Sequence, residues 1–171
     1  QNDPLISIRD LHVSFGSVEV LHGIDLDIEQ GVIHALIGES GSGKSVLARS
    51  ILGLAGNNCR INGSIQFQGK ELLTLSAEEY RKLRGAEIAM VVQDAMSALN
   101  PMRTIGHQLM ETIACRHPNY RDHNPATVLA THKHDLHDIA LELLKTVGIT
   151  APEKRMTSYA HQLSGGMRQR I

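Results

Sequence analysis

Apolar and polar residues alternate through three segments in the first seventy positions of the chain: 5–13, 17–31 and 61–70. The alternation is cleanest at Ile24, Leu26 and Ile28, which are separated by two aspartates. A period of two is typical of strands with one face buried and the other in water. The pattern therefore predicts an antiparallel, half-exposed sheet, with a turn at residues 68–70.

Two other runs are apolar without alternation: VIHALI at 32–37 and EIAMVVQ at 87–93. Continuous apolar runs of this length are typical of strands that are buried on both faces of a sheet. The sequence offers no further runs to serve as the central parallel strands that would cover these two. We therefore expect buried-type strands with open edges.

Helical spacing of apolar residues begins after Lys44. Residues 76–79 (SAEE) match a capping box, which predicts the start of a short helix. From Asn100 onward the strand pattern disappears, and apolar residues at helical spacing predict helices over 102–116 and 135–148. The second half of the chain is therefore expected to form an all-helical lobe.

Composition changes this picture little, but it excludes some functions. A length of 171 residues, of which 42% are hydrophobic, fits one domain with a lobe attached. The net charge of −1 leaves no basic surface in bulk, which argues against nucleic acid as a partner. The two cysteines lack a CxxC spacing, which favours a reducing compartment. No apolar run approaches the roughly 20 residues of a membrane-spanning helix, so we expect any membrane role to depend on a partner.

The segment GESGSGKS at 38–45 satisfies the phosphate-loop pattern G-x-x-x-x-G-K-[ST] in full. Its glycines allow successive backbone N–H groups to point into one nest, and the following helix adds its positive N-terminal end. Lys44 places a full charge near the outer phosphates, and the Ser45 hydroxyl can hold Mg²⁺. The flanking strand and helix favour this interpretation over a plain surface loop, although ATP and GTP are not distinguished. The residues expected at the nucleotide are Gly38, Glu39, Ser40, Gly41, Ser42, Gly43, Lys44, Ser45 and Val46.

A second glycine turn lies in LSGGMRQR at 163–170. Ser164 is a polar cap residue, two glycines follow it, and a helix-compatible run begins near Met167. Backbone N–H groups at such a turn can bind an anion. Taken alone, the segment fits an ordinary capped helix start equally well.

The run LSGGMRQRI resembles the signature motif of ABC-transporter ATPases. GESGSGKS upstream and Gln93 between the two segments strengthen the resemblance to that family. QDAMSALNPM at 93–102 and INGSIQFQGK at 61–70 narrow the resemblance to the ATP-binding subunits of peptide and nickel importers. It covers nearly the whole chain and is weakest over 117–134. The resemblance implies an α/β fold: a P-loop NTPase of the ABC type, with an antiparallel β subdomain and an α-helical subdomain. The C-terminal part of the core sheet is expected to be missing.

The resemblance also implies a division of the chain and roles for single residues. Residues 1–93 would form the nucleotide-binding core, and residues 94–171 would run from the glutamine loop through the helical subdomain to the signature. Phe15 matches the aromatic residue that stacks on adenine, although a place in the core of the sheet is the alternative. Gln93 matches a glutamine that contacts Mg²⁺ and the attacking water, so the implied catalytic residues are Lys44 and Gln93.

Further implied roles concern partners. The signature residues would cap ATP held by a second ABC ATPase subunit, so that two subunits enclose two nucleotides; these residues are Ser164, Gly165 and Gly166. Residues 94–103 would lie near the surface that meets integral membrane permease subunits. Ala95 stands where the family usually has proline, which leaves the shape of that loop open.

The resemblance predicts an ATPase subunit for peptide or nickel import, bound peripherally at the cytoplasmic face of the bacterial inner membrane, with ATP and Mg²⁺ as cofactors. Hydrolysis in the family also needs a strand ending in Asp-Glu and a later switch histidine, and the sequence shows neither. We therefore expect a fragment of a longer ATPase, with a naturally short, non-hydrolysing ATP-binding partner as the alternative. A DNA-repair or chromosome ATPase is disfavoured, since no coiled coil or zinc module separates Ser45 from Leu163.

Five histidines lie in or near the polar stretch between the two predicted helices: His117, His123, His132, His134 and His137. The resemblance to nickel importers suggests a metal site. No carboxylate or cysteine set completes one at metal-ligand spacing. A solvated loop is the favoured interpretation.

Overall fold

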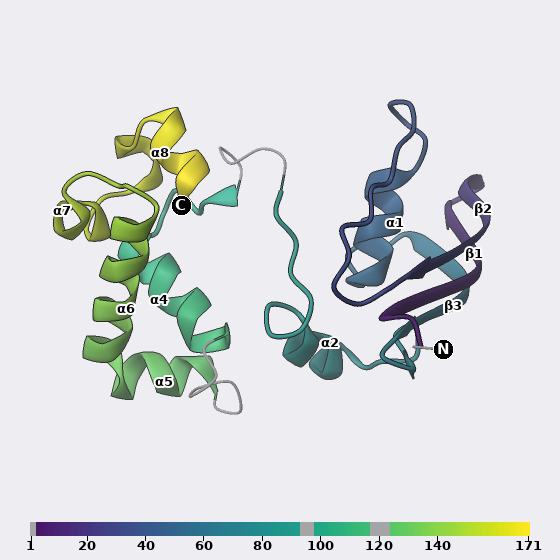
Figure 1. Ribbon diagram of the computed structural model, residues 1–171, viewed down its shortest axis with the longest axis horizontal. Coiled ribbons are helices and arrows are strands. Elements are labelled where there is room, and N and C mark those ends of the chain that lie inside the picture. Colours follow the sequence, from purple (N-terminus) through teal and green to yellow (C-terminus); the bar gives the residue numbers. More distant parts are fainter. Residues whose placement is uncertain (1–2, 93–97, 117–123) are drawn as a thin grey trace. The chain divides into compact units, whose positions relative to one another are not determined.

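The computed structural model describes residues 3–92, 98–116 and 124–171 of the chain (Figure 1). These residues belong to two compact units, Gln1–Arg84 and Gly85–Ile171. The first unit contains the strands of the main sheet and two helices, and the second is helical. Residues 93–97, which include Gln93, lie outside the described part.

The first unit is built on a four-stranded antiparallel sheet with the strand order β2-β1-β3-β4. The strands are β1 (Ile6–Phe15), β2 (Val18–Ile28), β3 (Cys59–Phe67) and β4 (Lys70–Glu71). Ile8, Leu11, Val13 and Ile65 are fully buried, while Asp25 and Asp27 on β2 are exposed. The predicted half-exposed sheet is therefore confirmed.

The pairing of β1 is interrupted by a bulge at Asp10. Asp10 has a φ of 46°, in the left-handed region that non-glycine residues rarely adopt. On the neighbouring strand, a Cβ at Gly63 would lie 2.3 Å from the carbonyl oxygen of Asp10. Only glycine fits there, so Gly63 allows β3 to follow the bulged strand closely.

Helices α1 (Lys44–Ile51) and α2 (Ala77–Leu83) complete the first unit. Ser76 and Glu79 form the capping box that the sequence predicts, with the serine hydroxyl accepting from Glu79 N. Beyond α2, Arg84 donates from Nε to the carbonyl of Leu52 at 2.7 Å, just past the end of α1. A cation at that end stabilises the last, unpaired carbonyls of the helix.

The two predicted buried strands are wrong. Residues 32–37 and 87–92 form no strand, and most of their apolar side chains are exposed, with Ile33 at 102% and Val91 at 97% of the reference area. A strand needs a neighbour to satisfy its backbone N–H and C=O groups. Within the described residues the main sheet pairs only the four strands named above, so neither run has such a neighbour.

The second unit packs short helices around one apolar cluster. They are α4 (Ile105–Arg116), α5 (Pro125–Thr131), α6 (Lys133–Thr146), α7 (Pro152–Met156), the 3₁₀ helix η1 (Ala160–Gln162) and α8 (Gly165–Arg170). The cluster includes Ala114, Val128, Leu136, Ala140 and Leu144. The predicted helices over 102–116 and 135–148 are confirmed as α4 and α6, with ends displaced by a few residues.

Helix α5 was not predicted, because the whole stretch between the two helices is polar enough to suggest a loop. Its start does carry a sequence signal: the side chain of Asn124 accepts a hydrogen bond from Ala126 N at 2.9 Å, and Pro125 occupies the first turn. Both are favoured residues at a helix N-terminus. Val128 then anchors the helix in the core at 2% exposure.

Candidate functional site

The phosphate loop enters α1 through glycines in the left-handed region. Gly41 has a φ of 84° and Gly43 a φ of 89°, and Gly43 is the N-cap of the helix. A Cβ at Gly43 would also lie 2.5 Å from Leu21 Cδ2. Backbone conformation and space thus both require glycine at this position.

Lys44 folds back over the loop that precedes it. Its Nζ donates to the carbonyl oxygens of Gly38 at 2.7 Å and Glu39 at 2.5 Å, and lies 3.2 Å from Ser42 Oγ. The described first turn of α1 holds no acidic residue, so the positive end of the helix is not neutralised there. The loop therefore combines an ammonium group with a helix N-terminus, an arrangement suited to a polyanion such as a triphosphate.

The remaining residues expected at the nucleotide lie on the same unit. Ser40 is exposed in the loop, and Ser45 and Val46 lie in the first turn of α1, with Ser45 exposed. Phe15 ends β1, where it pairs with Val18 and Cys59, and it is half-buried. Its partial exposure is compatible with stacking on adenine, and its strand position suits a role in the sheet, so both alternatives stay open.

The signature turn starts α8. Ser164 is the N-cap, and its hydroxyl accepts a hydrogen bond from Met167 N at 3.3 Å, so the helix begins at Gly165 rather than near Met167. A Cβ at Gly165 or Gly166 would meet no described atom within 4 Å. The backbone of this turn is therefore open to approach from outside the unit.

Part of the predicted site lies outside the described residues: Gln93 with the segment as far as Ser97, and two of the histidines, His117 and His123. The other three of these five histidines are described, and a ring nitrogen of each lies near a carboxylate oxygen: His132 at 3.5 Å from Asp135, His134 at 3.2 Å from Asp138, and His137 at 3.5 Å from Asp138. Across the described ranges, no group of three or more His, Cys, Asp or Glu side chains could hold a metal ion.

A family model described as "ABC transporter" matches residues 21–171 of the chain. The chain belongs to the ABC transporter family. The match takes in both glycine turns, so the resemblance found on the sequence motifs is confirmed.

Among curated relatives, this ABC transporter chain is 41% identical over 175 residues to the "Dipeptide transport ATP-binding protein DppD" of Bacillus subtilis, covering 99% of the chain and 49% of the relative. It is 37% identical over 175 residues to the "Oligopeptide transport ATP-binding protein OppD" of Escherichia coli, covering 100% of the chain and 48% of the relative. The chain thus spans about half the length of these relatives.

Solved structures show the same fold. The dimeric ATP-binding cassette MJ0796 in a post-hydrolysis state superposes with a TM-score of 0.73 at 23% identity, over 96% of this chain and 66% of that one. A structure titled as an ATP-binding subunit of an ABC transporter gives a TM-score of 0.61 at 24% identity, over 97% and 58%. The predicted ABC ATPase fold is therefore confirmed.

The sheet of this ABC transporter chain also carries a charged cluster that motif reasoning missed. His12 lies between two carboxylates, with Nδ1 2.6 Å from Glu19 Oε1 and Nε2 3.0 Å from Asp10 Oδ1. His22 contacts the other oxygen of Glu19 at 3.2 Å. The hydrogen bond to Glu19, followed by that to Asp10, raises the pKa of His12, and the same bond lowers the pKa of Glu19.

We expect the cluster to make stability depend on pH. The pKa of His12 is higher in the folded chain than in the unfolded one, so its contribution is fully present below about pH 6.5 and is lost as the pH rises through the folded value. Urea unfolding of wild type and His12→Ala between pH 5.5 and 8.5 should show a smaller loss of stability with pH in the variant. His34→Ala, in the exposed segment 32–37, is the control. Parallel curves for wild type and His12→Ala would contradict the expectation.

Proposed function

We propose that this chain is the nucleotide-binding part of a subunit that energises a peptide importer through ATP-driven dimerisation. The phosphate loop supports ATP binding, because Gly41 and Gly43 shape it and Lys44 lies across it at the start of α1. We propose that Ser45 and Gln93 would hold Mg²⁺ beside the nucleotide. In this proposal residues 1–93 hold the nucleotide, and residues 94–171 carry the signature and the contact with the membrane subunits.

The second half of the proposal concerns partners. An exposed turn with two uncovered glycines fits the capping of ATP on another ABC ATPase subunit, which is the role that we propose for Ser164, Gly165 and Gly166. Integral membrane permease subunits are proposed to meet the chain at residues 94–103. Among the described helices, none combines the length and apolarity needed to cross a bilayer. We propose a peripheral position at the cytoplasmic face of the bacterial inner membrane, because the proposed contact with permease subunits would hold the chain there.

The names of the relatives favour peptides over nickel as the cargo, because they specify dipeptide and oligopeptide transport. These relatives are about twice as long as the chain. We propose that the whole protein hydrolyses ATP, with Lys44 and Gln93 as catalytic residues. For the chain of 171 residues we propose ATP binding.

One experiment tests the proposal directly. Calorimetry of the chain with ATP, with and without Mg²⁺, should show affinity that depends on the metal ion, and light scattering should show a doubling of mass when MgATP is added. Folded protein that shows neither result would refute the proposal. Binding without a change in mass would leave the phosphate loop in place and refute the role of the signature turn.

A further inference from the structure

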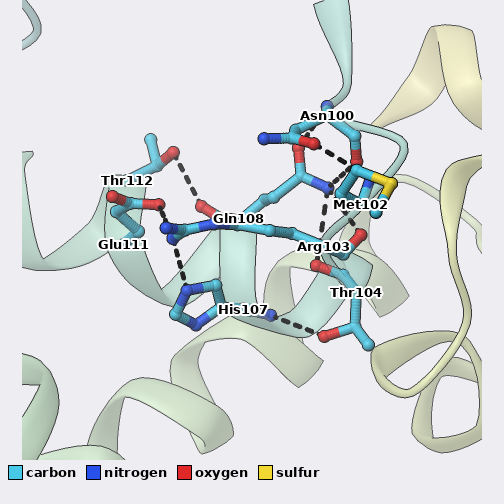
Figure 2. Close-up of polar contacts among 8 residues, drawn as sticks. All are labelled: Asn100, Met102, Arg103, Thr104, His107, Gln108, Glu111 and Thr112. Carbon is cyan, nitrogen blue, oxygen red and sulfur yellow. Dashed lines mark hydrogen bonds and ion pairs between the residues drawn. The ribbon is translucent and has the colours of Figure 1, made fainter.

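The side chain of Gln108 on α4 binds the backbone of the turn formed by residues 100–103 (Figure 2). Gln108 Oε1 accepts a hydrogen bond from Asn100 N at 2.8 Å, and Gln108 Nε2 donates to Asn100 O at 3.0 Å. The same nitrogen donates to Arg103 O at 3.0 Å. The carboxamide therefore binds both backbone groups of Asn100 and one of Arg103. The opposite amide orientation would set like groups against each other, so the bonds also fix which atom is oxygen.

The turn has supporting bonds of its own. Asn100 Oδ1 accepts from Met102 N at 2.9 Å, and Arg103 N donates to Asn100 O at 3.3 Å. The Arg103 guanidinium forms an ion pair with Glu111 at 3.1 Å and a hydrogen bond with His107, both on α4. Figure 2 shows these side chains gathered around the first turns of α4. The turn is thus fixed by its own backbone and by one face of the helix.

This well-fastened turn presents an apolar side chain to solvent. Met102 is 83% exposed at the tip of the turn. Ordering the backbone of a surface loop costs roughly 1–2 kcal/mol of free energy per residue. Burial of the Met102 side chain offsets little of this cost, because the side chain is mostly exposed. Gln108 itself is half-buried, and the bonds described for its side chain go to the backbone of Asn100, Arg103 and Thr104. These bonds therefore serve the turn.

The base of the turn is joined to the segment that leads into Ser164. Thr104 pairs antiparallel with Tyr159, and Ile105 N donates to Ser158 O at 2.8 Å. At Gly106, an added Cβ would lie 2.7 Å from Met156 O, so the first turn of α4 packs directly on the end of α7. A displacement of the turn would therefore be transmitted to the backbone that precedes the signature.

We propose that Gln108 is a positioning residue, whose carboxamide holds the turn 100–103 on α4 so that Met102 keeps a fixed place relative to the segment leading into Ser164. This positioning would matter for binding to the membrane subunits, a role that rests on the proposed function, in which residues 94–103 meet those subunits. A turn that is already ordered loses less conformational entropy when it binds. The fastening itself depends on neither ATP nor a partner.

Backbone ¹⁵N relaxation of the chain tests the fastening. We expect order parameters near 0.85 for Met102 and Arg103 in the wild type and below about 0.6 in Gln108→Leu. Thr112→Val is the matched control, because it removes a hydroxyl bond to the backbone of the same helix, at Gln108 O, and spares the turn. Unchanged order of Met102 and Arg103 in Gln108→Leu would overturn the proposal.

Gln108→Glu separates positioning from a general contribution to folding. A protonated carboxyl group can accept from Asn100 N and donate to Asn100 O, as the amide does, whereas a carboxylate turns an anionic oxygen toward two carbonyls. The order of Met102 should therefore be low at pH 7 and should recover as the pH falls through the carboxyl pKa, ordinarily about 4.3. The wild type also contains Arg103, His107 and Glu111, which lie in or beside the turn. Order parameters of the wild type over the same pH range therefore control for any effect of these three residues. A Glu variant without this recovery, in protein whose α4 core signals at Ala114 remain native, would overturn the proposal.

Discussion

Replacing Gly165 by aspartate should abolish ATP-driven dimerisation and leave the affinity of the monomer for ATP unchanged. The fold has room for the change, because a Cβ at Gly165 meets no described atom within 4 Å and its φ is not positive. An acidic residue in the first turn of α8 also suits the helix dipole. In the proposed dimer, however, the new carboxylate would face the triphosphate on the partner. At about 4 Å and an effective dielectric constant near 20, the repulsion is about 4 kcal/mol at each of the two nucleotides, and one such contact alone weakens dimerisation roughly a thousandfold.

Gly165→Asn is the matched control, since it adds nearly the same volume without the charge. Sedimentation equilibrium with MgATP should give weak dimerisation for the asparagine variant and none for the aspartate variant, with equal ATP affinities in calorimetry. An equal loss in both variants would assign the effect to size rather than charge. A loss of ATP affinity in the Gly165→Asp monomer would contradict the separation of the two turns.

The predicted parts of the fold that the structure confirms are those in which a local sequence pattern lies close to the residues that it contacts. Alternation over β1, β2 and β3 predicted the sheet because each strand pairs with a strand of the same unit. The capping box at Ser76 is a contact between residues three positions apart, so the sequence alone is sufficient to find it. The same holds for the phosphate loop, whose glycines and lysine interact within one short segment.

The failures have the opposite origin. The apolar runs at 32–37 and 87–92 indicate a preference for burial, but a pattern does not say which strands would lie beside them. The bulge at Asp10 depends on the space beside Gly63, which is more than fifty positions away in the sequence. Gln108 belongs to no motif, because its role consists of bonds to a backbone eight and five residues earlier. Contacts of this kind become visible only in the folded chain.

Changing Lys44 to alanine should weaken the binding of MgATP by about a hundredfold. Hydrogen bonds that involve a charged group contribute about 1.5–3 kcal/mol each, and Lys44 is the only lysine within the phosphate loop motif. The loss of about 3 kcal/mol corresponds to about two orders of magnitude in the dissociation constant. The variant loop also loses the bonds from Nζ to the carbonyls of Gly38 and Glu39, so its shape is less restrained. Calorimetry with MgATP measures the change.

Two control variants separate the charge of Lys44 from its other effects. Lys82→Ala removes an equal charge from the exposed surface of α2 and should change the affinity less than twofold, because exposed charges at a distance are screened by salt. Ser42→Ala removes a hydroxyl that is itself expected at the nucleotide and lies 3.2 Å from Lys44 Nζ, but it keeps the ammonium group, so the loss of affinity should be smaller than in Lys44→Ala. If Lys44→Ala bound MgATP as tightly as Lys82→Ala does, the phosphate loop would not be the nucleotide site. If Ser42→Ala bound MgATP as weakly as Lys44→Ala, the charge of Lys44 would not account for the loss of affinity.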